Sequence, residues 1–218
     1  MAFDKNLIDT HSGNISMGIR DTMLITVAGK SLIDLKDADF TTVPLRVSVR
    51  NKPNKEAPHI GPVPSSEIEV HRFILQSFPD STVFHSHPPS ATALSILSCN
   101  KKVRSIMREG NNEFTKNQIK NAEEVCSKYP ETTFITPLDF ETRYFFPQIP
   151  VYPLSFTEDI KKGRGFADFK KIGIFGGNGV FMVKSHGSFA WGKTPLDALR
   201  WTLVLETAAK LILLASSH

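Results

Sequence analysis

Two consecutive prolines, Pro88-Pro89, restrict the backbone conformation of the residues before them and mark the end of a secondary-structure element. The preceding segment Thr82–His87 is predicted as a strand, and the strand must stop at the prolines because proline cannot continue inside a sheet. Side chains two positions apart on a strand point to the same face. We therefore expect His85 and His87 to lie side by side at the end of this strand.

Two neighbouring imidazoles are a suitable pair of ligands for a divalent transition metal, although two polar residues at a strand end are the more common meaning of this pattern. His186 lies in a similar context, because the strand predicted over Val180–Lys184 runs into Ser185-His186-Gly187. Taken alone, a His-Gly pair is usually a turn. Imidazoles from two strand ends with one open position would together form the three-ligand arrangement of a catalytic zinc site.

A carboxylate lies close to this pattern along the chain. A helix should begin at Ser65 or Ser66, which are good N-cap residues, and Glu67 lies in its first turn. The helix leads directly to the strand of His85, so Glu67 could return to the metal and act as a general acid or base. The ordinary alternative is an acid that interacts only with the helix dipole.

Small loops and a helix start supply candidates for binding phosphate. Ser12-Gly13-Asn14 and Ala28-Gly29-Lys30 can offer backbone N–H groups to an anion. Ser65 and Ser66 add hydroxyls at a helix N-terminus, where the dipole favours negative charge. Each fragment taken alone is more often a turn or a cap.

The remaining predicted elements frame these candidates. The strongest helix is expected from Pro195 to about Ser216, because proline suits a first turn and the apolar residues recur at three or four positions. The charged segment Asn100–Tyr129 is interpreted as a solvated face or an insertion. Further expected elements are strands over Met23–Val27 and Thr41–Val49, a helix from Ser90 to Leu97, and an extended segment over Phe145–Pro153.

Charge and hydropathy exclude two classes of partner. The 26 basic and 22 acidic residues give a net charge of +4, which is too mild for a nucleic-acid-binding surface. The segment Lys161–Lys171 carries a charge of +4 by itself and is interpreted as a solvated loop. No apolar run approaches 18 residues, so we expect neither a membrane span nor a membrane partner.

Length and cysteine content indicate the number of domains and the cellular compartment. The 218 residues favour a single domain over 1–218. Only Cys99 and Cys126 are present, which suits a reducing compartment and gives no thiolate metal site. Met1–Asn6 lacks the apolar segment of a secretory signal. We therefore expect a cytoplasmic protein.

Taken in order, these motifs resemble the class II aldolase/adducin head family, and the resemblance covers nearly the whole chain. The motifs that carry it are Ser12-Gly13-Asn14-Ile15-Ser16, Leu24-Ile25-Thr26-x-x-Gly29-Lys30, Ser65-Ser66-Glu67 with His71, His85-x-His87-Pro88, and His186-Gly187 with Trp191-Gly192-Lys193.

The resemblance implies an α/β fold, a three-layer α/β/α sandwich around a largely antiparallel sheet, assembled as a homotetramer with sites between subunits. It implies zinc (Zn2+) held by His85, His87 and His186, with Glu67 as the acid/base. The residues that it implies for binding the phosphate of a small phosphorylated sugar are Asn14, Gly29, Ser65 and Ser66.

The reaction implied by the resemblance is cleavage of a phosphorylated ketose by a zinc-dependent aldolase, a lyase, through a metal-stabilised enediolate. A sugar-phosphate dehydratase, decarboxylase or epimerase of the same family is an alternative, and so is a non-catalytic adducin-like interaction module. Epimerases of the family carry Asp at the position of Glu67, and adducin heads have lost the zinc histidines. An aldolase is therefore the first expectation.

Two departures from the family pattern bear on this expectation. The usual Thr-Pro-Ser/Thr-Gly of the phosphate loop is here Thr26-Val27-Ala28-Gly29, so one hydroxyl is lost and only backbone donation survives. The family's aldolases also carry a proton-donating tyrosine just after the second proline of Ile-Pro-x-x-Pro. Here Leu154 occupies that position, and Tyr152, two positions earlier, is the implied proton donor.

Overall fold

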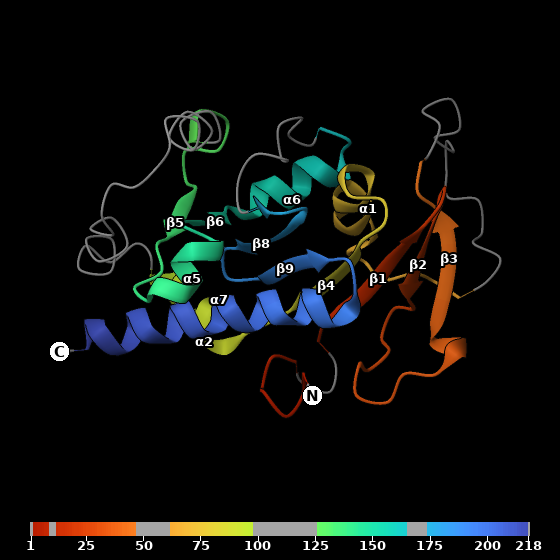
Figure 1. Ribbon diagram of the computed structural model, residues 1–218. Helices are drawn as coiled ribbons and strands as arrows, with labels where there is room; N and C mark the ends of the chain where they lie inside the picture. Colours follow the sequence, from red (N-terminus) through yellow and green to blue (C-terminus); the bar gives the residue numbers. More distant parts are fainter. Residues whose placement is uncertain (1, 9–11, 47–61, 98–125, 165–173, 218) are drawn as a thin grey trace.

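The computed structural model describes residues 2–8, 12–46, 62–97, 126–164 and 174–217. These residues form an α/β fold built on a mixed sheet (Figure 1). The α/β class expected from the resemblance is therefore confirmed. Most of the predicted insertion 100–129 lies outside the described residues.

The strands of the sheet follow the order β3-β2-β1-β4-β9-β8-β6-β5, with β7 paired to β8 beside this path. The pair β6 and β8 is parallel, and the other described pairs are antiparallel. The bounds of the strands are β1 (Asn14–Ile19), β2 (Thr22–Thr26), β3 (Phe40–Pro44), β4 (Thr82–Ser86), β5 (Thr133–Ile135), β6 (Ile149–Tyr152), β7 (Ile174–Phe175), β8 (Asn178–Val183) and β9 (Gly187–Gly192).

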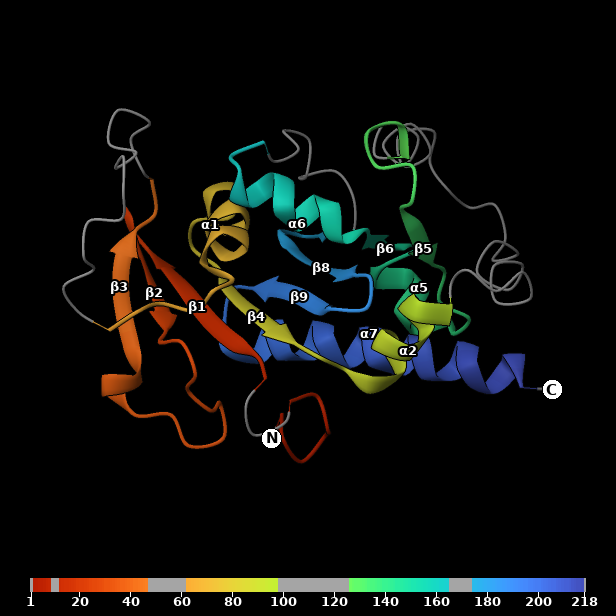
Figure 2. The ribbon, with the colours of Figure 1, turned by 180° about the vertical axis from the view of Figure 1, so that it is seen from behind.

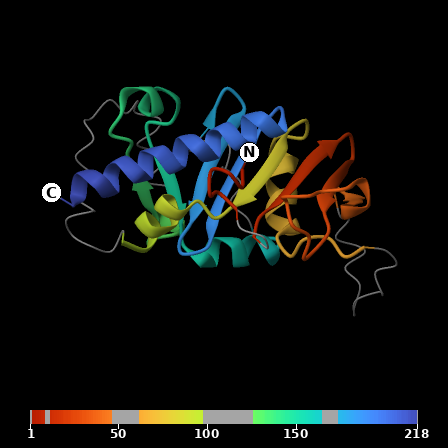
Figure 3. The ribbon, with the colours of Figure 1, turned by 90° about the horizontal axis from the view of Figure 1, so that it is seen from below.

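Helices cover both faces of the sheet. The helices α1 (Ile68–Ser77) and α6 (Leu154–Lys161) lie side by side over one face (Figures 1 and 2). The helices α2 (Pro89–Leu97) and α7 (Pro195–Ser216) pack over the other, with α5 (Phe140–Phe145) against α7. Figure 3 shows α6 and α7 on opposite sides of the strands.

The alternation of side chains along β8 explains this arrangement. Phe181 and Val183 are buried with α1 and α6 in one hydrophobic core, whereas Val180 and Met182 are buried with α2 and α7 in another. Successive residues of a strand point to opposite faces, so a strand that is apolar throughout needs cover on both sides. The sheet is therefore buried on both faces where the two helical pairs lie.

The predicted helix from Pro195 to about Ser216 is confirmed as α7. Thr194 accepts a hydrogen bond from the backbone N–H of Asp197 at 3.1 Å, Asp197 closes the capping box, and Pro195 occupies the first turn. Although α7 has 22 residues, no helix in the described part of the chain is long and apolar enough to cross a membrane.

A contact between α7 and α2 fixes the chain just beyond the double proline. Glu206 of α7 accepts hydrogen bonds from the backbone N–H groups of Ser90 and Ala91, both at 3.0 Å. These N–H groups at the start of α2 have no partner within the helix itself. A carboxylate from another helix therefore caps α2 at the exit of β4.

Several elements differ from the sequence prediction. The helix α1 begins at Ile68 with Glu67 as its N-cap, two or three residues later than expected. The strand over Thr41–Val49 is observed as Phe40–Pro44, and its last residues lie outside the described ranges. The strands β1 and β9 and the helices α5 and α6 were not predicted.

Candidate functional site

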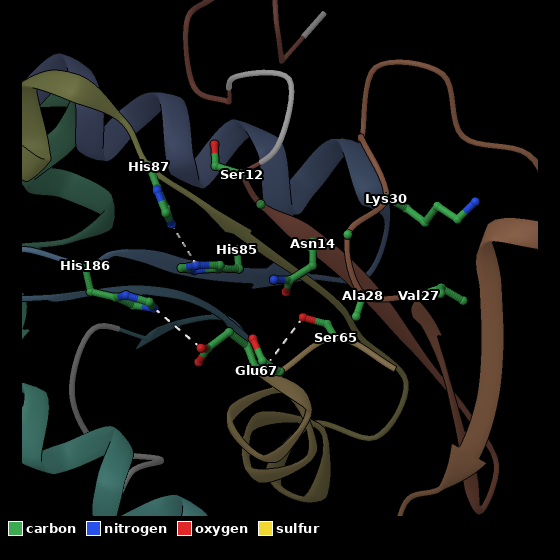
Figure 4. Close-up of a pocket in the computed structure, with 13 residues that line it drawn as sticks. Ser12, Asn14, Val27, Ala28, Lys30, Ser65, Glu67, His85, His87 and His186 are labelled. Atoms are coloured by element: carbon green, nitrogen blue, oxygen red, sulfur yellow. Dashed lines mark hydrogen bonds and ion pairs between the residues drawn. The ribbon is translucent and has the colours of Figure 1, made fainter. Parts of the chain in front are cut away.

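A pocket of about 210 Å³ opens where β1, β4 and the start of α1 meet (Figure 4). Eight of the nine predicted site residues line it, and Tyr152 does not. The lining residues are Ser12, Gly13, Asn14, Val27, Ala28, Gly29, Lys30, Ser65, Ser66, Glu67, His85, His87 and His186.

His85 is held by the strand next to its own. It is 2% exposed, and its Nδ1 atom lies 2.9 Å from the backbone carbonyl oxygen of Ser188 on β9. A carbonyl oxygen only accepts, so Nδ1 carries the proton and Nε2 keeps its lone pair. Burial, reinforced by the neighbouring imidazoles of His87 and His186, holds the pKa of His85 well below its usual value. The neutral ring with an unprotonated Nε2 is the form that binds a metal.

The other two imidazoles surround His85. The Nε2 atoms of His85 and His87 are 3.1 Å apart, and their ring centroids are separated by 4.9 Å. The ring of His186, in the turn between β8 and β9, stacks on His85 at 5.0 Å and lies 5.6 Å from His87. The structure therefore brings the three imidazoles together, and their role as metal ligands stays a prediction.

Gly187 allows the turn that carries His186 to lie close to His85 and His87. A Cβ atom at this position would lie 2.6 Å from Cδ2 of His87, 2.6 Å from the carbonyl oxygen of Ser86 and 2.9 Å from Cε1 of His85. Glycine is thus required because the turn that carries His186 passes directly against the end of β4.

One pair of nitrogen donors in this cluster has the spacing of zinc ligands. Two nitrogen ligands of a tetrahedral zinc ion lie about 3.3 Å apart when each bond is about 2.0–2.1 Å, close to the observed separation of the two Nε2 atoms. As the side chains stand, no three His, Cys, Asp or Glu groups in the described ranges form a complete metal site. His186 instead faces Glu67, with 3.8 Å between its Nε2 and Oε1 of the carboxylate (Figure 4).

Glu67 brings a carboxylate to the edge of the histidine cluster. It is the N-cap of α1 and only 8% exposed, and its backbone N–H donates to Oγ of Ser65 at 3.3 Å. Its Oε1 lies 3.7 Å from Nζ of Lys161 as well as near His186. Its Oε2 is buried and has no hydrogen-bond partner among the described residues. The carboxylate therefore has unused hydrogen-bonding capacity at the edge of the histidine cluster.

The opposite end of the pocket is built from small loops. An isolated bridge joins Val27 to Pro64, and the N–H of Ser65 donates to the carbonyl of Thr26 at 3.0 Å, so the loop containing Gly29 lies against the start of α1. Gly29 adopts a φ of +74°, in the region that favours glycine. These contacts bring together backbone and hydroxyl groups that are far apart in the sequence.

Asn14 links this end of the pocket to the histidines. It lies directly opposite His85 in the pairing of β1 with β4. Its Oδ1 is buried and has no partner among the described residues. A buried polar atom without a partner is costly, so this amide is placed to bind a polar group of a ligand.

Tyr152 lies elsewhere. It is 1% exposed in β6, and its ring stacks on Phe156 of α6 with centroids 4.0 Å apart. Burial raises the pKa of its hydroxyl, which has no hydrogen-bond partner in the described part of the chain. The structure does not bring Tyr152 to the pocket, because α6 covers the face of β6 toward which this side chain points.

Two lysines belong to the surroundings of the site, although neither side chain was among the predicted site residues. Lys30 lines the pocket and forms an ion pair with Asp39 at 2.8 Å. Lys161, which pairs with Glu67, is the first residue of the basic segment that was interpreted as a solvated loop. Charge alone gave no signal for Lys161, because its contact depends on how α6 packs against α1.

The chain belongs to the family described as "Class II Aldolase and Adducin N-terminal domain", whose model matches residues 1–213. The resemblance recognised in the sequence motifs is therefore confirmed. The comparison with curated protein sequences gave no significant match.

Solved structures of this family share the fold. L-fuculose-1-phosphate aldolase from Thermus thermophilus is 22% identical, with a TM-score of 0.63 over 98% of this chain and 88% of that one. YgbL from Klebsiella pneumoniae, a candidate aldolase/epimerase/decarboxylase, is 20% identical, with a TM-score of 0.62 over 98% and 83%. A sugar-phosphate aldolase from Thermotoga maritima is 18% identical, with a TM-score of 0.55 over 99% and 90%.

Proposed function

We propose that this protein is a zinc-dependent lyase that cleaves a small phosphorylated ketose in an aldolase reaction. One observation carries the proposal. Three imidazoles and the carboxylate of Glu67 lie at one end of a pocket whose other end is lined by small hydroxyl and backbone groups. Such a pocket can hold a short substrate with a metal-binding oxygen at one end and a phosphate at the other.

His85, His87 and His186 would hold the zinc ion. When bound, zinc supplies a Lewis acid that polarises a carbonyl oxygen of the substrate. The hydrogen bond from His85 to Ser188 keeps the first of these imidazoles in the required tautomer and orientation. Gly187 lets the turn with His186 approach the other two.

Glu67 would move the proton at the carbon that becomes nucleophilic when the carbon–carbon bond breaks. The support lies in its position, since Oε1 is 3.8 Å from the imidazole of His186 and the buried Oε2 has no described partner. A general base must lie within reach of the proton that it takes. The place of the carboxylate beside the histidines supports this role for a ligand held against them.

The phosphate would lie at the N-terminus of α1. Hydroxyls of Ser65 and Ser66, the amide of Asn14 and the backbone N–H of Gly29 line that end of the pocket. A helix N-terminus favours an anion through its partial positive charge. These groups are all neutral, so the helix dipole and hydrogen bonds would supply most of the attraction.

The proposal is tested by metal analysis and a substrate panel. We expect about one zinc per chain, as the three-histidine site requires, and release of dihydroxyacetone phosphate from at least one ketose 1-phosphate. Protein that binds no zinc and cleaves no member of the panel would contradict it. The same result would favour the non-catalytic interaction module.

One observation favours a second candidate, another reaction of the same family on the same site. The hydroxyl of Tyr152, the implied proton donor of the aldolase, is buried away from the pocket. Dehydration and decarboxylation of a sugar phosphate form no aldehyde by carbon–carbon cleavage between two carbinol carbons, so they do not use the proton donor of the aldolase. Loss of water, release of carbon dioxide or inversion without cleavage would identify these reactions in the same substrate panel.

We also propose a homotetramer in the cytoplasm. The support for assembly is the family resemblance together with the strongly exposed Phe140 and Tyr144 on α5, which offer apolar surface to a second copy of the chain. Light scattering coupled to gel filtration should give the mass of four chains. A monomeric mass at micromolar concentration would contradict the assembly.

A further inference from the structure

The loop Val27–Lys30 lines the end of the pocket away from the histidines, and most of its backbone N–H groups are already used within the protein. Three of the four donate to backbone carbonyl oxygens. Among the described residues, the N–H of Gly29 has no acceptor, so it is the donor of this loop that a bound anion can use. The three occupied donors are Val27 to Asp39 at 2.8 Å, Ala28 to Val63 at 2.9 Å and Lys30 to Val27 at 3.3 Å.

Side-chain packing does not hold Gly29 in place. No described atom lies within 4 Å of the position that a Cβ atom would take, and the φ of +74° makes the chain turn sharply. A segment with few packing contacts keeps its orientation through the contacts at its two ends. The direction of the Gly29 N–H therefore depends on what anchors the residues before and after it.

The two ends of the loop are anchored differently. Before Gly29, backbone bonds and the bridge from Val27 to Pro64 attach the chain to its neighbours. After Gly29, the side chain of Lys30 makes the anchor, since its Nζ lies 2.8 Å from Oδ1 of Asp39. Figure 4 shows this side chain extending away from the histidines. The ammonium group is thus directed at Asp39 and not at the centre of the pocket.

Asp39 is a fixed partner for this lysine. The residue is only 9% exposed, and its Oδ2 accepts a hydrogen bond from the N–H of Lys36 at 3.1 Å. Its carbonyl oxygen holds the N–H of Val27, at the other end of the same loop. An ion pair to a largely buried carboxylate is screened less by solvent than a pair between two exposed groups. Asp39 therefore attaches to the loop on both sides of Gly29.

We propose that Asp39 is a positioning residue for the phosphate end of the substrate and that it acts through Lys30. The ion pair fixes the residue after Gly29 and so keeps the Gly29 N–H in the orientation that serves the anion. Neither charged side chain has to touch the phosphate. The inference rests on the proposed function, because it assigns a phosphate to this end of the pocket.

The test measures the dissociation constant of inorganic phosphate on the full chain by phosphorus NMR titration. The variants are Lys30→Met, Asp39→Asn and the double substitution, and Lys30→Arg keeps the cation. Lys36→Met and Asp34→Asn are the matched controls, because these two residues form an exposed pair at 3.9 Å in the same stretch of chain. All of these variants leave the histidines unchanged, so any phosphate bound at a metal contributes equally to each measurement.

Anchoring and simple charge predict opposite results for Asp39→Asn. Removing a negative charge beside the pocket would strengthen the binding of an anion, whereas losing the anchor would weaken it. We expect each single variant to weaken phosphate binding by at least about threefold, and the double variant to be no weaker than the weaker single one. Lys30→Arg and both controls should stay within about twofold of the wild type.

Turnover of the active ketose phosphate supplies a second readout. Lys30→Met and Asp39→Asn should raise KM by at least about threefold and leave kcat within about twofold, because binding of the phosphate contributes equally to ground state and transition state. Tighter phosphate binding in Asp39→Asn would show that Lys30 itself attracts the anion and would overturn the inference, as would unchanged affinities. Wild-type protein that binds no phosphate would instead contradict the proposed function, and the inference with it.

Discussion

The imidazole of His85 donates its Nδ1 proton to the backbone carbonyl of Ser188, across the central pair of strands β4 and β9. This bond fixes the tautomer of a ring that is otherwise free to carry its proton on either nitrogen. A backbone acceptor cannot be removed by substituting the side chain of Ser188. The orientation of His85 is therefore built into the pairing of the two strands.

Replacing His85 by alanine should abolish stable zinc binding. The variant loses the ligand at the centre of the cluster, and we expect the zinc content after dialysis to fall below about one tenth of the wild-type value, since a catalytic site has only three protein ligands. Atomic absorption measures the content. His71→Gln, which changes a buried histidine away from the pocket lining, is the control and should keep its zinc.

Replacing Gly187 by alanine should damage the fold and the metal site together. The new methyl group would overlap His87 and the carbonyl of Ser86, so the turn must move away from β4. We expect a loss of about 1–3 kcal/mol in the free energy of unfolding, measured with urea, and weaker zinc binding.

Gly29→Ala is the matched comparison for that variant. No atom lies within 4 Å of the position that its Cβ would take, but its φ of +74° costs about 1–2 kcal/mol for alanine. It should lose stability and keep its zinc affinity. Equal zinc affinity in Gly187→Ala would contradict the role given to that glycine.

Replacing Glu67 by glutamine should separate binding from chemistry. The amide has nearly the same shape but cannot accept the proton, so we expect zinc content to be retained and turnover to fall by about 10²–10⁴. Steady-state rates with the active ketose phosphate give the measurement. Glu69→Gln, on the same helix and half-exposed, should keep its activity. Undiminished turnover in Glu67→Gln would remove this residue from the reaction.

Replacing Tyr152 by phenylalanine should leave turnover within about twofold of the wild type, because the hydroxyl lies outside the pocket. The free energy of unfolding should be unchanged or higher by up to about 1 kcal/mol, since a buried hydroxyl without a described partner is removed. A fall in turnover of a hundredfold with an unchanged fold would restore Tyr152 as the proton donor.

Acidic pH should destabilise the fold through His71. This residue is fully buried, its Nδ1 lies 2.6 Å from Oγ of Ser16, and burial lowers its pKa to about 3. The unfolded chain takes up the proton near pH 6.5, so stability is lost as the pH falls from 6.5 toward 3. The loss between pH 7 and pH 5 should be about 2 kcal/mol.

The matched measurement uses His71→Gln, whose amide can still bond to Ser16. Urea unfolding at pH 7 and at pH 5 should show a smaller difference in this variant than in the wild type, by about the same 2 kcal/mol. An identical pH dependence in both proteins would show that His71 is not the group responsible.

The parts of the site that could be predicted are those encoded in short local patterns. The double proline marked the end of the strand that carries His85 and leads to His87. The serines indicated a helix close to Glu67, although α1 begins only at Ile68. The helix α7 was predicted with its bounds because proline suits the first turn and the apolar residues recur at three or four positions.

The missed parts depend on contacts between distant segments. The strand β9 is buried on both faces and rich in small residues, so it shows no alternation that would reveal a strand. The orientation of Tyr152 depends on the cover that α6 provides, and α6 itself was not predicted. The contact of Lys161 with Glu67 depends on the packing of α6 against α1, and local sequence patterns do not predict which helices pack together.

Glu206 ties the C-terminal helix to the first turn of α2, immediately beyond the histidine strand. These two hydrogen bonds hold the start of α2 in place relative to α7, although no residue of α7 lines the pocket. A mutational screen restricted to the residues that line the pocket would not include Glu206. Substitution of Glu206 removes two hydrogen bonds to the backbone just beyond His87, while every lining side chain stays the same.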